Sequence, residues 1–141
     1  MSRIYWDTML FVYFIEEHPE HTLRVREILA AMSRRRDSLC TSVFTIGEVL
    51  TGPYKKGSVE LASQVKESIR PPRVELLPFN AETAERYARI RAEKRVSPAD
   101  AIHLASAAHA GVDLFLTNDR RLPRLVIPGI DFIAGMDVNL F

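Results

Sequence analysis

Residues 97–119 read SPADAIHLASAAHAGVDLFLTND, and they contain the signals for a complete helix and for the strand that follows it. Ser97 is a favoured helix cap, and Pro98 suits the first helical position. Small residues recur along the helix and permit close packing, and Gly111 ends it. The apolar run at 114–116 predicts a strand directly after this helix. A helix that leads into a short apolar strand is typical of an α/β fold.

Strands and helices alternate over the rest of the chain in the same way. Apolar runs predict strands at 3–6, 39–41 and 74–77 and an edge strand at 130–133, and apolar residues at helical spacing predict helices at 9–15, from Thr22 to the arginines 34–36, from Ser42 or Thr45 to Thr51, from Ser58 to Pro71, and from Asn80 to about Lys94. We expect Gly52 and Pro53 to end the third of these helices, because proline interrupts helical hydrogen bonding. The alternation implies a parallel α/β sheet.

The composition fits one compact domain that spans residues 1–141. With 141 residues and 47% apolar content the chain can bury a core without disulfides, and it has a single cysteine. We expect Cys40 to be a buried apolar residue, because free cysteines are usually buried. No apolar run approaches the ~20 residues that span a bilayer, and Asp7 and Glu16 interrupt the apolar start of the chain. The protein is therefore expected in the cytoplasm, without a membrane segment.

The net charge of +1 favours no particular partner, but the basic residues are clustered. The clusters are Arg34 to Arg36, Lys55 with Lys56, and Arg120 with Arg121 and Arg124. If such basic residues surround a group of acidic ones, they suit a polyanion whose phosphate must reach a metal ion held by the acids. The alternative is that these residues are solvated helix ends and loops. We favour that alternative for Arg34 to Arg36, because cations stabilise the last turn of a helix.

Four acids lie where a predicted strand or helix begins or ends, namely Asp7, Glu48, Asp100 and Asp119. Each has an ordinary structural explanation: a helix cap, a solvent-facing helix residue, a favourable charge in a first helical turn, and a turn residue. Acids at the carboxyl ends of strands and the starts of helices can also converge on one crevice of an open sheet, where ligands bind. Converging carboxylates need a compensating charge. A divalent-metal site is therefore the first hypothesis.

The order and spacing of these acids, with Asp100 leading the run DAIHLA and Asp119 ending the run LTND, resemble those of the PIN-domain nucleases. The resemblance covers essentially the whole chain and is greatest to the VapC-like toxins of bacterial and archaeal toxin–antitoxin pairs. It implies a three-layer α/β/α sandwich with a mostly parallel central sheet. It also implies that Asp7, Glu48, Asp100 and Asp119 hold Mg²⁺ or Mn²⁺. Met9 departs from the pattern, because family members often have a polar residue, commonly Asn, at this position.

The resemblance further implies an endoribonuclease toxin that cleaves single-stranded RNA, forms a homodimer and is inhibited by a VapB-like antitoxin. In this hypothesis the three aspartates hold the metal directly or through water, and Glu48 positions or deprotonates the attacking water. Thr117 and Asn118 are expected to support the acids through hydrogen bonds. The exposed candidates for contacts with the RNA backbone are Arg120, Arg121 and Lys55.

Other residues near the acids have ordinary explanations. His103 lies one helical turn after Asp100 and could reach the site, but no second His or Cys stands at ligand spacing, so we expect a packing or surface residue. Tyr5 and Trp6 are expected in the core rather than as base-stacking groups. An exposed apolar groove could bind the antitoxin, and the candidates to line it are Phe11, Phe14, Leu50 and Tyr54. For most of these residues we expect core packing instead.

Three other α/β classes are disfavoured. Resemblance to the haloacid dehalogenases would require a second Asp where Met9 stands, and resemblance to receiver domains would require adjacent acids near the first strand and a lysine after the last. No glycine-rich dinucleotide-binding motif follows a strand. The remaining alternative is a PIN-like module that binds RNA or a protein without useful catalysis. The intact acids disfavour it, because an unneeded acidic cluster is costly to keep charged.

Overall fold

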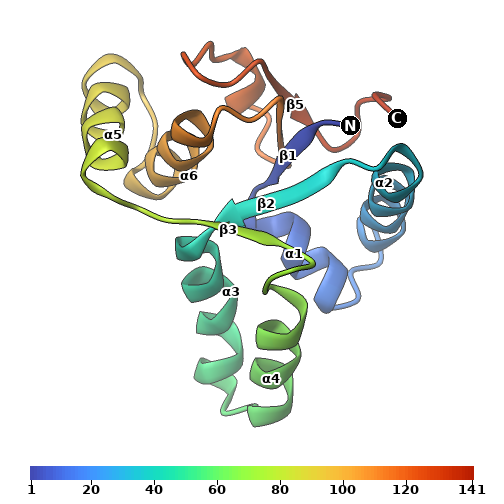
Figure 1. The fold of residues 1–141 in the computed structure, drawn as a ribbon. Coiled ribbons are helices and arrows are strands. Elements are labelled where there is room, and N and C mark those ends of the chain that lie inside the picture. The colour runs from blue at the N-terminus through green and yellow to red at the C-terminus, as the bar shows by residue number, and fades with distance from the viewer.

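Five strands form a sheet at the centre of the molecule, which the computed structural model describes over residues 1–141 (Figure 1). The strands are β1 (Arg3–Trp6), β2 (Ser38–Ser42), β3 (Glu75–Leu77), β4 (Leu114–Thr117) and β5 (Phe132–Gly135). Their order across the sheet is β3-β2-β1-β4-β5, and every neighbouring pair is parallel. The predicted parallel α/β fold is confirmed, and the predicted last strand lies at one edge of the sheet.

Helices connect the strands, as parallel neighbours require. They are α1 (Thr8–Ile15), α2 (Thr22–Arg35), α3 (Val43–Lys56), α4 (Val59–Ser68), α5 (Ala81–Glu93) and α6 (Pro98–Ala110), and a 3₁₀ turn, η1 (Leu122–Arg124), follows β4. Arg36 directly after α2 adopts a left-handed conformation, and the basic run that it completes is exposed. These arginines form a solvated helix end, as expected.

Side chains of the central strands alternate between two apolar clusters, one on each face of the sheet. In β1, Ile4 and Trp6 belong to the cluster formed with α1, α2 and α4, whereas Tyr5 belongs to the cluster formed with α5 and α6. In β4, Leu116 and Phe115 divide in the same way. Successive residues of a strand point to opposite faces of the sheet, and on each face they pack against helices. Both faces are therefore covered. The three-layer α/β/α sandwich is confirmed, and Tyr5 and Trp6 are core residues, as expected.

The helix that carries Asp100 begins and ends where the sequence predicts. Pro98 is its first residue, and Ser97 accepts a hydrogen bond from the backbone N–H of Asp100 at 3.1 Å. Gly111 follows the helix with a φ of 68°, a conformation that glycine adopts without strain. The small residues of α6 are buried along most of the helix. The first turn of a well-anchored helix therefore holds the Asp100 carboxylate.

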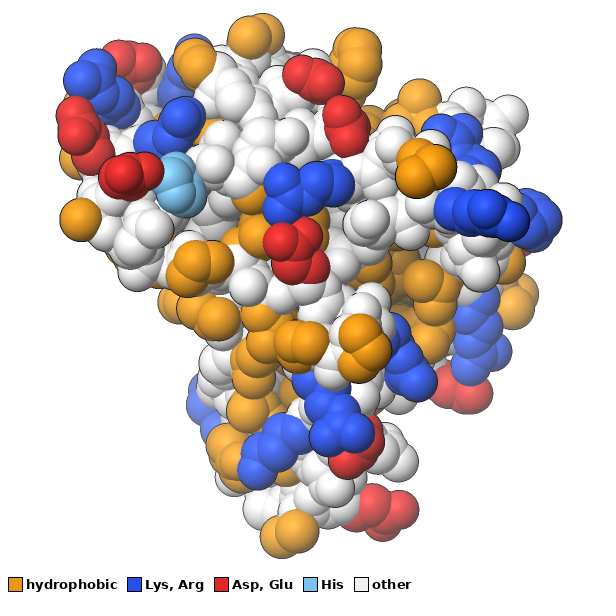
Figure 2. All heavy atoms as spheres, viewed as in Figure 1, with side chains coloured by type: hydrophobic (Ala, Val, Ile, Leu, Met, Phe, Trp, Pro, Cys, Tyr) orange, Lys and Arg blue, Asp and Glu red, His pale blue; other side chains and the backbone are white.

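α3 is longer than the sequence predicts. The expected end at Gly52 and Pro53 is wrong, because α3 continues to Lys56 and is followed by Gly57 in the left-handed conformation. Pro53 is buried, and α3 packs against α4 and α1, which compensates for the backbone hydrogen bond that proline removes. The two helices α3 and α4 project together from the sheet, with apolar side chains interspersed among lysines and arginines over them (Figures 1 and 2).

Other expectations drawn from composition and pattern can be compared with the fold. Cys40 is fully buried, and burial raises the pKa of its thiol to about 12, so it is a core residue, as expected. Of the apolar residues considered for a groove, Phe11 is buried, Phe14 and Leu50 pack partly against the core, and Tyr54 is 60% exposed. No helix combines the length and the apolar character needed to cross a bilayer.

Candidate active site

All four acids singled out in the sequence line one pocket of about 300 Å³. Asp7 directly follows β1, and Asp119 follows β4. Glu48 comes from α3, and Asp100 comes from the first turn of α6. The pocket is completed by Thr8, Met9, His103 and Asn118. The structure thus brings together residues from four separate elements at the carboxyl ends of two adjacent strands, where open parallel sheets bind ligands.

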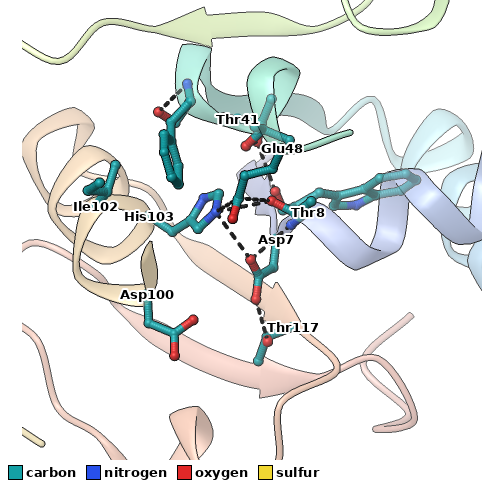
Figure 3. Close-up of polar contacts among 12 residues, drawn as sticks. Asp7, Thr8, Thr41, Glu48, Asp100, Ile102, His103 and Thr117 are labelled. Atoms are coloured by element: carbon teal, nitrogen blue, oxygen red, sulfur yellow. Dashed lines mark hydrogen bonds and ion pairs between the residues drawn. The ribbon is translucent and has the colours of Figure 1, made fainter. Parts of the chain in front are cut away.

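Asp7 is both a helix cap and a pocket residue, so its two explanations are compatible. One carboxylate oxygen, Oδ1, accepts a hydrogen bond from the Thr8 backbone N–H at 2.8 Å. The other, Oδ2, accepts one from the Thr117 hydroxyl at 2.8 Å (Figure 3). The Thr117 hydroxyl in turn accepts a hydrogen bond from the Asp119 backbone N–H at 3.0 Å. Thr117 therefore orients Asp7 and the loop after β4 together.

Glu48 is held by one of its two oxygens. Oε1 accepts hydrogen bonds from the Thr8 hydroxyl at 2.5 Å and from His103 Nε2 at 2.6 Å. Partial burial raises the pKa of Glu48, but the hydrogen bonds from His103 and Thr8 outweigh burial, so the pKa lies below its ordinary value. The carboxylate is charged at neutral pH, and Oε2 makes no hydrogen bond within the protein.

Asp100 is the acid whose charge is least favourable. Burial raises its pKa, and the neighbouring charge of Asp7 and, more weakly, that of Asp119 raise it further. In Figure 3 the Asp100 side chain lies near Asp7 without a hydrogen bond to any residue drawn. These three carboxylates therefore lie close enough to repel one another, which is the electrostatic condition that a bound cation relieves.

Asp119 is paired with Arg121 of its own loop. The Arg121 side chain contacts both carboxylate oxygens, with Nε 3.1 Å from Oδ1 and Nη2 2.8 Å from Oδ2. This pairing holds the pKa of Asp119 below its ordinary value. Arg121 is exposed, as expected of a candidate for RNA contact, and in this structure its guanidinium is paired with Asp119. Arg120 and Lys55, the other two candidates, are exposed and make no hydrogen bond or ion pair in the structure.

Asn118 lines the same pocket but does not contact the acids. Its Nδ2 donates a hydrogen bond to the Tyr13 hydroxyl at 2.9 Å. Thr117 and Asn118 were both expected to hydrogen-bond to the acids, but only Thr117 does so. Asn118 instead connects the loop after β4 to α1.

His103 is a site residue, although the sequence analysis favoured a packing or surface role for it. It is only 2% exposed and contacts Glu48, with a second contact of 3.0 Å between Nε2 and the Thr8 hydroxyl oxygen. Its Nε2 also lies 3.7 Å from Asp7 Oδ1. The available signal was helical spacing, because residues three positions apart share a helix face and Asp100 already faces the pocket.

The donor chemistry of the pocket fits a hard divalent cation, since all four acids offer carboxylate oxygens. In this structure no three of them are close enough together to hold a metal ion as they stand. The reason is visible in their partners, because Glu48 is held toward His103 and Asp119 toward Arg121. Binding of a cation would have to draw Asp119 away from Arg121, whereas Glu48 can keep Oε1 on His103 and offer Oε2.

The fold and the carboxylate pocket define a class of α/β proteins with an acidic crevice at the carboxyl edge of a parallel sheet. The chain belongs to the PIN domain family, whose sequence profile matches residues 4–127. No curated protein sequence matches the chain.

The solved complexes that contain a chain with a similar structure include the following three. A chain of VapBC from Salmonella typhimurium, bound to DNA, is 28% identical, with a TM-score of 0.73 over 96% of this chain and 99% of that one. A chain of VapBC2 from Rickettsia felis, bound to a promoter DNA fragment, is 19% identical, with a TM-score of 0.76 over 94% and 98%. A chain of FitAcB from Neisseria gonorrhoeae is 22% identical, with a TM-score of 0.64 over 82% and 87%. The similarity therefore spans nearly the full length of the two VapBC chains.

Proposed function

We propose that this protein is a metal-dependent endoribonuclease, the toxin of a type II toxin–antitoxin pair, acting as one PIN domain over residues 1–141. The observation that carries the proposal is the convergence of Asp7, Glu48, Asp100 and Asp119 on one pocket. The raised pKa of Asp100 supports it, because burial and the charges of its neighbours make that site unfavourable without a cation.

The proposed chemistry is hydrolysis of a phosphodiester bond. Mg²⁺ or Mn²⁺, when bound, lowers the pKa of a water ligand and stabilises charge on the phosphoryl group. Asp7, Asp100 and Asp119 would supply oxygen ligands, and the hydrogen bonds to Thr8 and Thr117 orient Asp7 for that role. Glu48 is charged and has Oε2 available, so it can orient the attacking water or take a proton from it.

The proposed substrate is RNA, and the exposed cations around the pocket support a polyanion. Lys55 lies on α3 seven positions after Glu48, which is about two helical turns and ~10 Å along the axis on the same helix face. Arg120 lies beside Asp119 and has no partner in the protein. Arg121 would contact a phosphate only after leaving Asp119. These residues are proposed to bind the RNA backbone.

The proposed partners are a VapB-like antitoxin and a second copy of the chain, in the cytoplasm. The similarity to chains of VapBC and FitAcB complexes supports the antitoxin, and a further similar chain belongs to VapBC-5 from Mycobacterium tuberculosis, a member of the VapBC family of toxin–antitoxin systems. Exposed apolar residues on α3 and at the start of α4, Tyr54 at 60% and Val59 at 83%, offer a surface for such a partner.

The test is cleavage of a mixed pool of single-stranded RNA and tRNA by purified protein in Mg²⁺ or Mn²⁺, with EDTA as the metal-free control. Asp7→Ala and Asp100→Ala should abolish metal-dependent cleavage while the circular dichroism spectrum stays unchanged. Asp131→Ala, at an exposed residue outside the pocket, is the matched control and should cleave as the wild type does. Folded wild-type protein that cleaves no RNA in either metal would favour a non-catalytic binding module.

A further inference from the structure

A chain of hydrogen bonds runs from the buried face of the sheet to the carboxylate pocket. The Tyr5 hydroxyl lies 2.6 Å from His103 Nδ1, and His103 Nε2 lies 2.6 Å from Glu48 Oε1. Tyr5 is fully buried, and His103 is 2% exposed. Tyr5 belongs to the apolar cluster of α5 and α6, and His103 lines the pocket. The imidazole of His103 therefore links the buried Tyr5 hydroxyl to Glu48. Figure 3 shows His103 pointing from α6 toward Glu48 and Asp7.

The direction of each hydrogen bond follows from counting hydrogens. The Tyr5 oxygen accepts a hydrogen bond from the Ser42 backbone N–H at 3.2 Å, so its single hydrogen is free for His103 Nδ1. A neutral imidazole that accepts at Nδ1 carries its hydrogen at Nε2. That hydrogen points to Glu48 Oε1, which also accepts from the Thr8 hydroxyl. Tyr5 and Glu48 thus favour the same tautomer of His103, the one that donates to Glu48.

The imidazole is also fixed by packing. Its ring is edge-on to Tyr5, at 5.8 Å between centroids and 73° between planes. It is edge-on to Phe44 as well, at 5.5 Å and 61°. A ring held on two sides cannot follow a moving carboxylate, so Glu48 is held relative to the core of the protein rather than to a mobile loop.

We infer that Tyr5 and His103 are positioning residues for Glu48: they hold Oε1 by a directed hydrogen bond and leave Oε2 as the oxygen available to a cation or to water. This inference rests on the proposed function, because it assigns Glu48 to a cation site. A partner that fixes the orientation of a metal-ligating side chain commonly changes metal affinity or activity 10–100-fold when it is removed. Their role is to orient Glu48, not to contact the RNA or the reacting atoms.

The first test needs neither metal nor RNA. Nitrogen-15 NMR of the folded wild-type protein should show His103 with its hydrogen at Nε2 and with a hydrogen-bonded Nδ1, and Tyr5→Phe should shift the Nδ1 resonance toward that of a nitrogen without a hydrogen bond. Tyr87→Phe is the matched control, because Tyr87 is partly buried and makes no hydrogen bond, and it should leave the His103 signals unchanged. A wild-type His103 protonated at Nδ1 alone, or an Nδ1 resonance that Tyr5→Phe leaves unchanged, would overturn the inference.

The second test is Mn²⁺ binding, measured by calorimetry. Tyr5→Phe should weaken binding about tenfold, whereas Tyr87→Phe should not. His103→Gln keeps an N–H donor in reach of Glu48 and should bind more tightly than His103→Leu, which keeps none. Wild-type binding that both Tyr5→Phe and His103→Leu leave unchanged overturns the positioning role alone. Wild-type protein that binds no Mn²⁺ overturns the proposed function, and the NMR result then stands as the test of the hydrogen-bond directions.

Discussion

Replacing Tyr5 by phenylalanine removes one buried oxygen and leaves the ring in place. The substitution leaves two buried groups without a partner, His103 Nδ1 and the Ser42 backbone N–H. A buried polar group that loses its partner costs about 1–3 kcal/mol, so two such groups cost about 2–6 kcal/mol. Small shifts of the neighbouring side chains recover part of this, and we expect a loss of about 2–4 kcal/mol. A domain of ordinary stability, about 5–15 kcal/mol, stays folded after such a loss.

Urea unfolding followed by the fluorescence of Trp6 measures this change, because Trp6 is the only tryptophan, is buried and adjoins Tyr5. For a chain of this size each kcal/mol shifts the melting temperature by about 2–4 °C, so a decrease of about 5–15 °C should accompany it. Tyr87→Phe, which breaks no hydrogen bond, should change stability by less than about 0.5 kcal/mol. A Tyr5→Phe variant as stable as the Tyr87→Phe control would refute the hydrogen-bond network.

Three further predictions concern the pocket and the turns around it. Asp100→Asn should raise the melting temperature at pH 7, because the pKa of Asp100 is raised in the folded state and its charged form therefore lowers stability. In a pH series this gain should vanish below about pH 4, where the wild-type carboxyl is protonated. Arg121→Gln should strengthen Mn²⁺ binding a few-fold in calorimetry, because it frees both oxygens of Asp119; weaker binding would contradict the competition between Arg121 and the cation. Gly129→Ala should lower the free energy of unfolding in urea by about 1–3 kcal/mol, because Gly129 has a φ of +101° and an added Cβ would lie 2.5 Å from the Ala108 carbonyl oxygen. The control is Gly52→Ala, in open space within α3, which should raise the free energy of unfolding by about 0.5–1 kcal/mol.

Local signals in the sequence predicted the elements that depend on local chemistry. α6 begins after Ser97 and ends at Gly111 because capping and left-handed backbone are properties of those residues. The end of α3 was predicted wrongly because the tolerance of Pro53 depends on packing against α4, which no local pattern reports. A helix end can therefore be predicted from the preferences of its residues unless tertiary contacts override those preferences.

The convergence of the acids was predictable because parallel strands end at the same edge of a sheet, so Asp7 and Asp119 had to be neighbours once their strands were. The contacts of His103 were not, because Tyr5 lies 98 residues away in sequence and Glu48 lies 55 residues away. The pairing of Arg121 with Asp119 is local, but an exposed arginine has many alternatives, and the sequence does not select among them.

If the four carboxylates form one cation site, replacing any one of them must weaken Mn²⁺ binding, and calorimetry on the wild type and on single variants measures this. The variants are Asp7→Asn, Glu48→Gln, Asp100→Asn and Asp119→Asn, with Asp131→Asn as the control outside the pocket. We expect saturable Mn²⁺ binding at the pocket in the wild type and in the control, and weaker binding in each pocket variant. Equal affinity in the wild type, Asp7→Asn and Asp100→Asn, with all three folded, would contradict the claim.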